Sequence, residues 1–97
     1  MAKEIRWSVR ADQDRLEIIQ YWTHRNKSTT YSIKLAKLFK DKTRLIAKTP
    51  ELGISTNSTS VRIKIVGDYL IYYSIQATYI EIITIWDSRR NPKKFKL

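Results

Sequence analysis

The sequence predicts a small α+β domain in which a short strand precedes two helices and three antiparallel strands. Residues 5–9 alternate apolar and polar side chains, which is the period of a half-buried strand. From about residue 10 to residue 48 the apolar residues recur at helical spacing, and residues 61–86 are dense in β-branched and aromatic residues. Because 97 residues can bury one hydrophobic core, we expect a single domain over residues 1–97.

The first strand is expected in the segment KEIRWSV, and the first helix follows it directly. Ser8 is predicted to cap this helix, because a serine hydroxyl accepts a hydrogen bond from a free amide of the first turn. The segment HRNKS (24–28) breaks the helical pattern. The apolar stripe of the helix contains Ala11, Leu16, Ile18, Ile19 and Trp22.

A second helix is predicted to begin after Ser28 or Thr29 and to end before Pro50, because a proline disfavours helical geometry in the preceding residue. One face carries Tyr31, Leu35, Leu38, Phe39, Leu45 and Ile46, and the other carries Lys34, Lys37, Lys40, Arg44 and Lys48. The short connection predicts an antiparallel helical hairpin. The cationic face is either the solvated side of the helix or a surface for a polyanion.

Three strands are predicted at residues 61–66, 69–75 and 79–86, joined by two-residue turns at 67–68 and 77–78. With these turns Tyr73 faces both Arg62 and Ile82, and Tyr69 faces Trp86. One sheet face then carries Arg62, Lys64, Tyr69, Ile71, Tyr73, Ile82, Thr84 and Trp86. The other carries Ile63, Ile65, Leu70, Tyr72, Ile83 and Ile85. Since the second set is nearly all apolar, we expect the helices to pack on it and the first, basic and aromatic set to be open.

Charge is the strongest compositional signal, because 19 Lys and Arg residues against nine acids give a net charge of +10. A domain this basic is attracted to nucleic acid, to acidic proteins or to anionic membranes. The absence of cysteine excludes disulfides and thiolate metal sites. His24, the only histidine, is expected at the surface, so we predict no metal site and no cofactor. No apolar run approaches the ~20 residues of a membrane span, and the N-terminus lacks a signal peptide, so we expect a cytoplasmic protein without membrane contact.

The segment after the last strand is the second basic feature. Residues 88–97 contain five cations and no acid, and Arg89 and Arg90 follow the strand directly. Their guanidinium groups are expected near the rim of the basic-aromatic face. Such a cluster suits the stabilisation of phosphoryl-transfer charge, and exposed rings suit the stacking of unpaired bases. The alternative is a basic tail that ends a strand and has no chemistry.

Several segments, in this order and spacing, resemble the RelE/ParE superfamily of bacterial toxins. They are the pair Tyr21–Trp22, PELG at 50–53, VRIKIVGDYLIYYSI at 61–75 and IWDSRRNP at 85–92. The resemblance covers almost the whole chain. It implies the toxin of a type II toxin–antitoxin module, of the kind associated with plasmid stabilization. The expected partner is a cognate, acidic antitoxin in a hetero-oligomer.

Two activities are implied by the two branches of the superfamily. The RelE branch cleaves mRNA in the ribosomal A site without a metal, using the 2′-hydroxyl of the RNA as nucleophile, whereas the ParE branch poisons DNA gyrase. By similarity to RelE-type sites, Arg62, Lys64 and Arg89 would hold the scissile phosphate and stabilise its transition state. Tyr73, Trp86 and Arg90 would contact the RNA. These assignments favour an mRNA endonuclease.

Two positions depart from the RelE pattern. Leu70 stands where these nucleases usually carry an arginine, and no Tyr or His follows Trp86 to handle a proton. Asp87 is the nearest acid, and beside two arginines we expect it to be paired with them. A gyrase inhibitor without enzymatic activity therefore stays an alternative, as does an inactive or purely RNA-binding relative.

Overall fold

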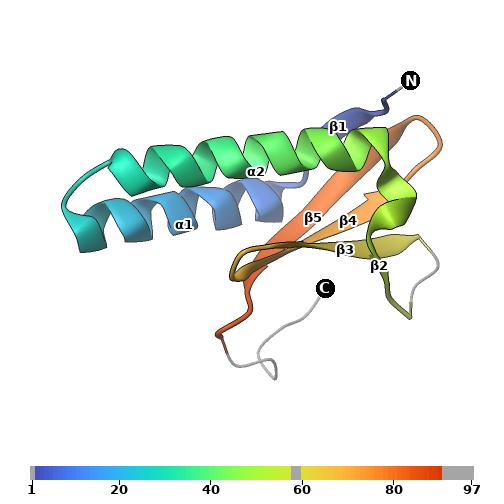
Figure 1. Ribbon diagram of the computed structural model, residues 1–97. Helices are drawn as coiled ribbons and strands as arrows, with labels where there is room; N and C mark the ends of the chain where they lie inside the picture. Colours follow the sequence, from blue (N-terminus) through green and yellow to red (C-terminus); the bar gives the residue numbers. More distant parts are fainter. Residues whose placement is uncertain (1, 58–59, 91–97) are drawn as a thin grey trace.

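The computed structural model describes residues 2–57 and 60–90, and the expected basic tail at 91–97 lies outside this part of the chain. The described elements confirm the predicted α+β order (Figure 1). They are β1 (Glu4–Trp7), α1 (Val9–Asn26), α2 (Thr30–Lys48), the 3₁₀ helix η1 (Pro50–Leu52), β2 (Ile54–Ser55), β3 (Val61–Val66), β4 (Tyr69–Ile75) and β5 (Tyr79–Asp87). The two elements η1 and β2 lie between the second predicted helix and the predicted strand at residues 61–66.

The strands of the described residues form one sheet with the order β1-β5-β4-β3-β2. β3, β4 and β5 are the predicted antiparallel meander, whereas β1 pairs in parallel with β5. The parallel pairing is possible because the helical hairpin carries the chain across one face of the sheet before it returns (Figure 1). β5 is therefore a central strand, with neighbours on both sides.

The start of α1 is fixed by the predicted cap. The Ser8 Oγ accepts a hydrogen bond from the amide of Ala11 at 2.9 Å and donates one to the Ile83 carbonyl at 2.7 Å. One hydroxyl thus caps the helix and ties it to β5. Farther along, the hydroxyls of Thr23 and Ser32 are hydrogen-bonded, which joins α1 to α2.

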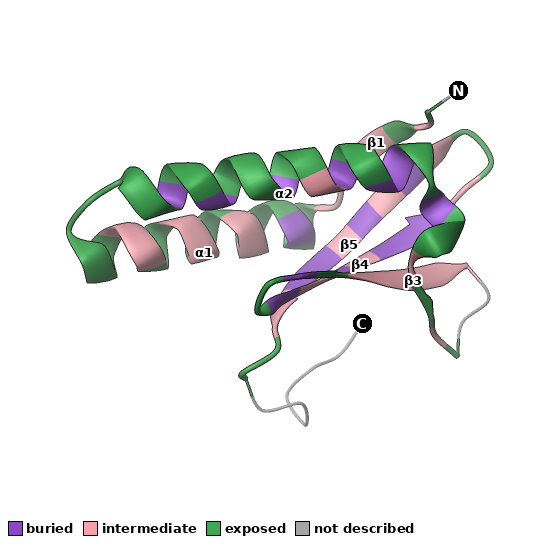
Figure 2. Cartoon of the chain, in the orientation of Figure 1, coloured by how far each residue is buried: buried purple, intermediate pink, exposed green. Residues whose placement is uncertain are grey.

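The hydrophobic core lies between the helical pair and the sheet (Figure 2). Its members come from both helices and from β3, β4 and β5: Ala11, Leu35, Phe39, Ile46, Val66, Tyr69, Ile71, Tyr73, Ile80, Ile82 and Ile85. Phe39 of α2 packs edge-on against Tyr69, with ring centroids 5.5 Å apart. Both predicted helices therefore bury side chains of their apolar faces.

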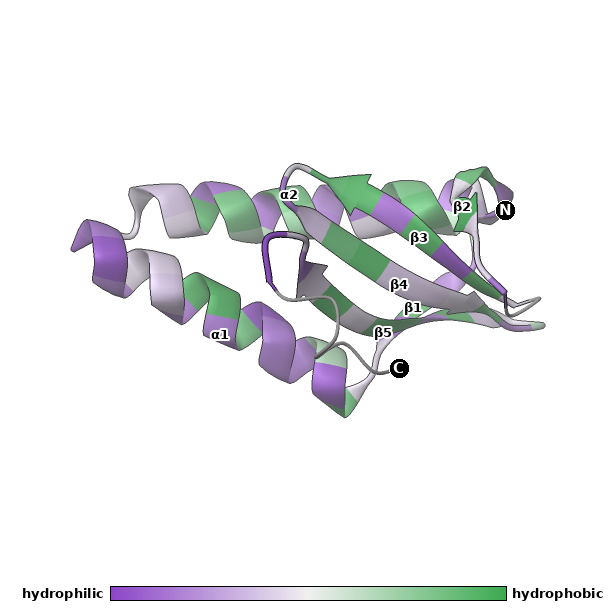
Figure 3. Ribbon diagram, turned by 90° about the horizontal axis from the view of Figure 1, so that it is seen from below, coloured by the Kyte–Doolittle hydropathy of each residue, from purple (hydrophilic) through white to green (hydrophobic). Residues whose placement is uncertain are grey.

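The predicted assignment of the two sheet faces is wrong on β3 and β4, although Ile85 of β5 is buried as expected. Tyr69, Ile71 and Tyr73 are buried beneath the helices, with 4%, 0% and 1% of their surface exposed. The other face of the sheet is turned away from α2 (Figure 3). Ile65, which pairs with Leu70, is 56% exposed. Burial of the tyrosines is favourable because their rings are large and apolar and their hydroxyls find partners inside the protein.

The register differs from the prediction at one end of the sheet. Both turns are as expected, since Val66 pairs with Tyr69 and Tyr73 pairs with Arg62 and Ile82. Between Tyr72 and Tyr73, however, the partner strand skips Ile83. This β-bulge shifts the remaining pairs by one residue, so Tyr69 faces Asp87 and not Trp86.

η1 lies against the buried end of β4. The Tyr73 hydroxyl donates a hydrogen bond to the Pro50 carbonyl at 2.6 Å. A Cβ at Gly53 would lie 2.0 Å from the Tyr73 Oη and 2.8 Å from its Cζ. The glycine of the PELG segment is therefore required by close approach to a buried ring.

We expect Gly53→Ala to destabilise the protein by about 1–3 kcal/mol, the usual cost of overpacking a core. Tyr73→Phe alone should cost about 1 kcal/mol, because the Pro50 carbonyl loses its buried donor. The double variant should be more stable than the sum of the two changes predicts, because removing the hydroxyl relieves the closest clash. Urea unfolding of the four proteins measures this coupling, and strict additivity would contradict the proposed contact.

Candidate functional site

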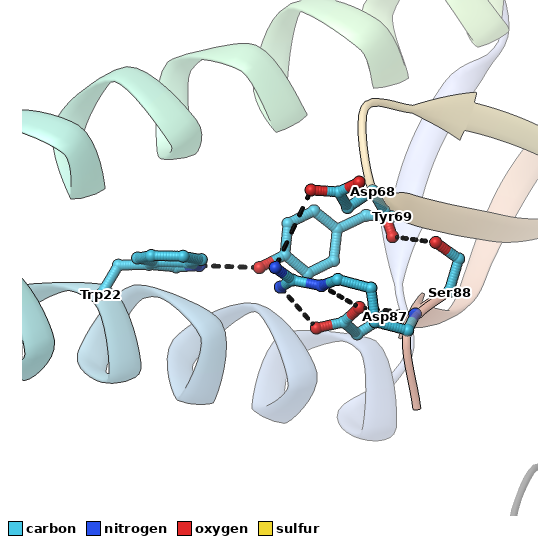
Figure 4. A network of polar contacts seen from close by, with 6 residues as sticks. Trp22, Asp68, Tyr69, Asp87 and Ser88 are labelled. Carbon is cyan, nitrogen blue, oxygen red and sulfur yellow. Dashed lines mark hydrogen bonds and ion pairs between the residues drawn. The ribbon is translucent and has the colours of Figure 1, made fainter. Parts of the chain in front are cut away.

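The end of β5 and the turn between β3 and β4 are joined by main-chain and side-chain hydrogen bonds. The amide and the hydroxyl of Ser88 both donate to the Asp68 carbonyl, at 2.8 and 2.7 Å (Figure 4). The turn itself requires Gly67, whose φ is +59°. The segment that follows the last strand is therefore held against the turn over the described residues.

Arg89 is paired with the carboxylates of Asp87 and Asp68, both of which are labelled in Figure 4. Its Nε and Nη2 donate to the two oxygens of Asp87 at 3.0 and 2.8 Å, and its Nη1 lies 3.9 Å from the Asp68 carboxylate. The hydrogen bond from the Arg89 side chain is the main cause that lowers the pKa of Asp87, although partial burial opposes it. The predicted pairing of Asp87 with an arginine is confirmed, and Asp87 is not poised to act as a base.

An aromatic cluster lies beside this ion pair. The indole of Trp22 donates a hydrogen bond to the Tyr69 hydroxyl at 2.7 Å (Figure 4). Tyr21 and Tyr31 pack edge-on against Trp22, and the Arg89 guanidinium is 5.8 Å from the centroid of its ring. Sequence reasoning missed the link between Trp22 and Tyr69, because a contact 47 positions apart leaves no local pattern.

A cavity of about 470 Å³ opens between α1 and the ends of β4 and β5. Its lining mixes acids, arginines and apolar groups: Asp14, Glu17, Ile18, Tyr21, Tyr69, Ile85, Asp87, Arg89 and Arg90. The Asp14 carboxylate accepts hydrogen bonds from the Thr84 hydroxyl and the Ile85 amide. Burial raises the pKa of Tyr69. The cavity thus brings charged and apolar groups together at one end of the sheet.

The other two predicted catalytic cations lie elsewhere on the sheet. The Arg62 guanidinium donates to the Gly53 carbonyl at 2.9 Å and to the Ser55 hydroxyl at 3.0 Å, so it is directed toward η1 and β2. Lys64 lines a small pocket with Leu45 and Tyr73. These two cations are neighbours on one face of β3.

Arg89 does not join them. The register places Arg62 opposite Tyr73, whereas Arg89 follows Asp87, the partner of Tyr69. Tyr69 and Tyr73 are four residues apart, which is about 13 Å along a strand. Each arginine is also hydrogen-bonded to its own local partners. Arg62 and Arg89 are thus held by different partners at different positions along the sheet.

The predicted RNA-contacting residues are divided between the two faces of the sheet. Tyr73 is buried beneath the helices, so its ring has no free face for a base, and burial raises the pKa of its hydroxyl. Trp86 pairs with Leu70 and lies on the opposite face. The Arg90 guanidinium stacks over the Trp86 ring, 4.7 Å from its centroid. The predicted common surface of Tyr73 and Trp86 is therefore wrong.

Neither a metal site nor a membrane span is found among residues 2–57 and 60–90. These residues contain no group of three or more His, Cys, Asp or Glu side chains that is suited to hold a metal ion. No helix in this part of the chain is both long and apolar enough to cross a bilayer.

Asp87→Asn should lower the melting temperature at pH 7 by a few degrees, because the ion pair with Arg89 is lost. Since the pKa of Asp87 is lowered in the folded state, its contribution is present above the pKa of the unfolded chain, about 3.8. It is lost as the pH falls through the lower, folded value. Thermal unfolding between pH 2 and pH 7 should therefore show the two proteins converging in acid.

Asp41→Asn is the matched control, because hydrogen bonding from Lys37 also lowers the pKa of Asp41. Both members of this ion pair belong to α2 and are exposed, so its loss should lower the melting temperature less than the loss of the Asp87–Arg89 pair. An equal effect of the two substitutions would show that Asp87 does not hold the end of the sheet.

The chain was compared with protein families and with known proteins. A family model described as the ParE toxin of the type II toxin–antitoxin system, parDE, matches residues 5–92. No curated protein sequence matches the chain.

Solved structures share the fold at low sequence identity. The chromosomal ParDE toxin–antitoxin system from P. aeruginosa contains a chain that is 12% identical, with a TM-score of 0.73. The YoeB dimer from Staphylococcus aureus is 17% identical, with a TM-score of 0.55. Each alignment covers 87% of this chain and 94% of the other. The predicted resemblance to the RelE/ParE superfamily is thus confirmed, and the chain belongs to the ParE toxin family of type II toxin–antitoxin systems.

Proposed function

We propose that this toxin acts by binding DNA gyrase and that it does not cleave mRNA. The observation that carries the proposal is the separation of the expected catalytic cations. Arg62 is bonded to the Gly53 carbonyl near one end of β3, and Arg89 is held by Asp87 near the other end. Stabilisation of a phosphoryl-transfer transition state requires cations that converge on one phosphate.

Proton transfer gives a second argument. An RNA 2′-hydroxyl becomes a nucleophile when a base accepts its proton. Asp87 is engaged by Arg89, which lowers its pKa, and the Tyr73 hydroxyl donates to the Pro50 carbonyl. Neither group is available as a base beside Arg62. A toxin that works by binding requires no such group. The family model that matches this chain, that of the ParE toxin, agrees with such an action.

The positive charge suits a target that includes DNA. Gyrase acts on bound DNA, and a net charge of +10 attracts a small protein to that complex over long range. The charge would also attract RNA, so it does not by itself separate the two activities.

The second candidate is the mRNA endonuclease that the sequence favours. It is supported by Arg62 and Lys64, which lie two residues apart on the same face of β3. In that case the ribosome would have to release Arg62 from Gly53 and bring a proton acceptor to the site.

One experiment separates these candidates. Purified toxin is added to gyrase with supercoiled plasmid, and in parallel to a translating extract with a reporter mRNA. We expect linear DNA after denaturation of gyrase, only when gyrase is present, and an intact mRNA in primer extension. The double variant Arg62→Ala/Lys64→Ala should still produce linear DNA with gyrase, because a toxin that acts by binding does not use these cations for catalysis.

The opposite pattern would falsify the proposal. It consists of A-site cuts in the mRNA that fall about a hundredfold or more in the double variant, the loss expected when transition-state cations are removed. Circular dichroism of the variant establishes that it is folded in either case.

A cognate antitoxin is part of the proposal, because the chain belongs to a toxin–antitoxin family. Expression of the toxin alone should stop growth, and coexpression of the small neighbouring open reading frame should restore it. The two proteins should then copurify. Growth arrest that no neighbouring gene relieves would contradict this partner.

A further inference from the structure

The cationic face of α2 lies on the side of the helix that is turned away from the sheet, and this side is exposed (Figure 2). Its five cations are all exposed: Lys34, Lys37, Lys40, Arg44 and Lys48. We refer to these five residues as the α2 cation row. At 3.6 residues per turn they fall within about 120° of the helix circumference, and at 1.5 Å per residue the row is about 21 Å long.

Positive charge is unevenly divided between the two helices. α2 contains six Lys or Arg residues and one acid, whereas α1 contains three Arg residues and three acids. Half of the net charge of +10 therefore lies on the 19 residues of α2. A charge that served solubility alone would not need this concentration, and such an asymmetry is typical of a surface that meets a polyanion.

The single acid of α2 is already paired. The Asp41 carboxylate accepts a hydrogen bond from the Lys37 ammonium at 2.8 Å. This hydrogen bond is the main cause that lowers the pKa of Asp41, and the charges of Arg44 and Lys40 lower it further. The four cations of the row other than Lys37 form no ion pair with any described residue. Most of the charge of the row is thus left for a partner.

The shape of the row selects the kind of polyanion. The row is convex, because it is the outer side of a helix. Protein partners gain most of their affinity from apolar and aromatic anchors that fill pockets, and charges are depleted at the centre of such interfaces. A phosphate backbone requires only cations spaced along a surface. Over 21 Å a DNA duplex presents about 12 phosphates, so the row fits a duplex better than a protein.

The residue types of the row indicate contact with phosphates and not with bases. Lysine binds a phosphate as a point charge, whereas base edges are read mainly by Arg, Asn and Gln side chains. Four of the five cations are lysines, and α2 contains no Asn or Gln. Binding through the row should therefore not depend on the base sequence.

We propose that the α2 cation row binds the phosphate backbone of duplex DNA and that, when the toxin acts, this is DNA held by gyrase. The second part rests on the proposed function, because only there is gyrase the target. The first part is a property of the free toxin, so it is tested without gyrase.

A labelled duplex tests the first part with the full chain. The probe is a fluorescein-labelled 20-base-pair DNA, and fluorescence anisotropy gives its affinity over a series of salt concentrations. Arg44→Ala/Lys48→Ala should weaken binding about tenfold or more at 0.1 M salt. It should also reduce the slope of log K against log salt by about 1.8, since each phosphate contact contributes about 0.9. A duplex of unrelated sequence should bind with the same affinity.

Two further variants locate the contact. Arg25→Ala/Lys27→Asn is the matched control, because it also removes one exposed Arg and one exposed Lys but lies at the end of α1. Asparagine suits position 27, whose φ is 51°. This control should change the slope by less than half as much. Asp41→Asn should strengthen binding a few-fold, because it removes the acid beside the row and releases Lys37.

Equal losses in Arg44→Ala/Lys48→Ala and Arg25→Ala/Lys27→Asn would overturn the first part. So would a row variant that loses as much affinity for polyglutamate, or for vesicles of phosphatidylcholine and phosphatidylserine, as for the duplex. Alanine is a strong helix former, so these exposed substitutions should leave the fold intact, which circular dichroism checks.

The gyrase assay with supercoiled plasmid tests the second part. Arg44→Ala/Lys48→Ala should give less linear DNA than Arg25→Ala/Lys27→Asn at the same toxin concentration. Equal yields would reject contact with gyrase-held DNA. If the unaltered toxin gives no linear DNA, the proposed function itself fails, and the duplex measurements still decide whether the row binds DNA.

Discussion

Tyr69 and Tyr73 lie beneath the helical pair with almost no exposed surface, and each hydroxyl has a partner there. Tyr69 accepts from Trp22 of α1, and Tyr73 donates to the Pro50 carbonyl. Without these hydrogen bonds the burial of two phenol groups would be costly. The two contacts fix where α1 and η1 lie on the sheet, so the position of the helices, the turn of the chain at Gly53 and the shape of the neighbouring surfaces all follow from them.

The same burial decides what the predicted site residues can do. With Tyr73 under the helices, its neighbour Arg62 is directed to the carbonyl of Gly53. At the other end of the strand, Arg89 is bound by Asp87 and holds the end of β5 beside Asp68. Both arginines thus hold neighbouring segments of the fold together through hydrogen bonds. This use of the two arginines supports the proposed action by binding to a target.

The apolar face of α2 is wider than the part of it that the core buries. A helix that packs on a sheet buries one stripe, and here Phe39 and Ile46 fill it. Leu38 and Leu45 exceed what the sheet can cover, because β3 is followed only by the two-residue strand β2. A narrow sheet therefore leaves Leu38 and Leu45 partly exposed on α2.

The sequence by itself determined the features that depend on neighbouring residues. The helical period, the cap at Ser8 and the turn at Gly67 each arise within a few positions, and their order was enough to indicate the family. Only the tertiary structure decided which face of the sheet is buried, where the bulge at Ile83 falls and which partners Arg62 receives. These depend on contacts between distant segments, and alternation along a strand is the same whichever of its two faces the helices cover.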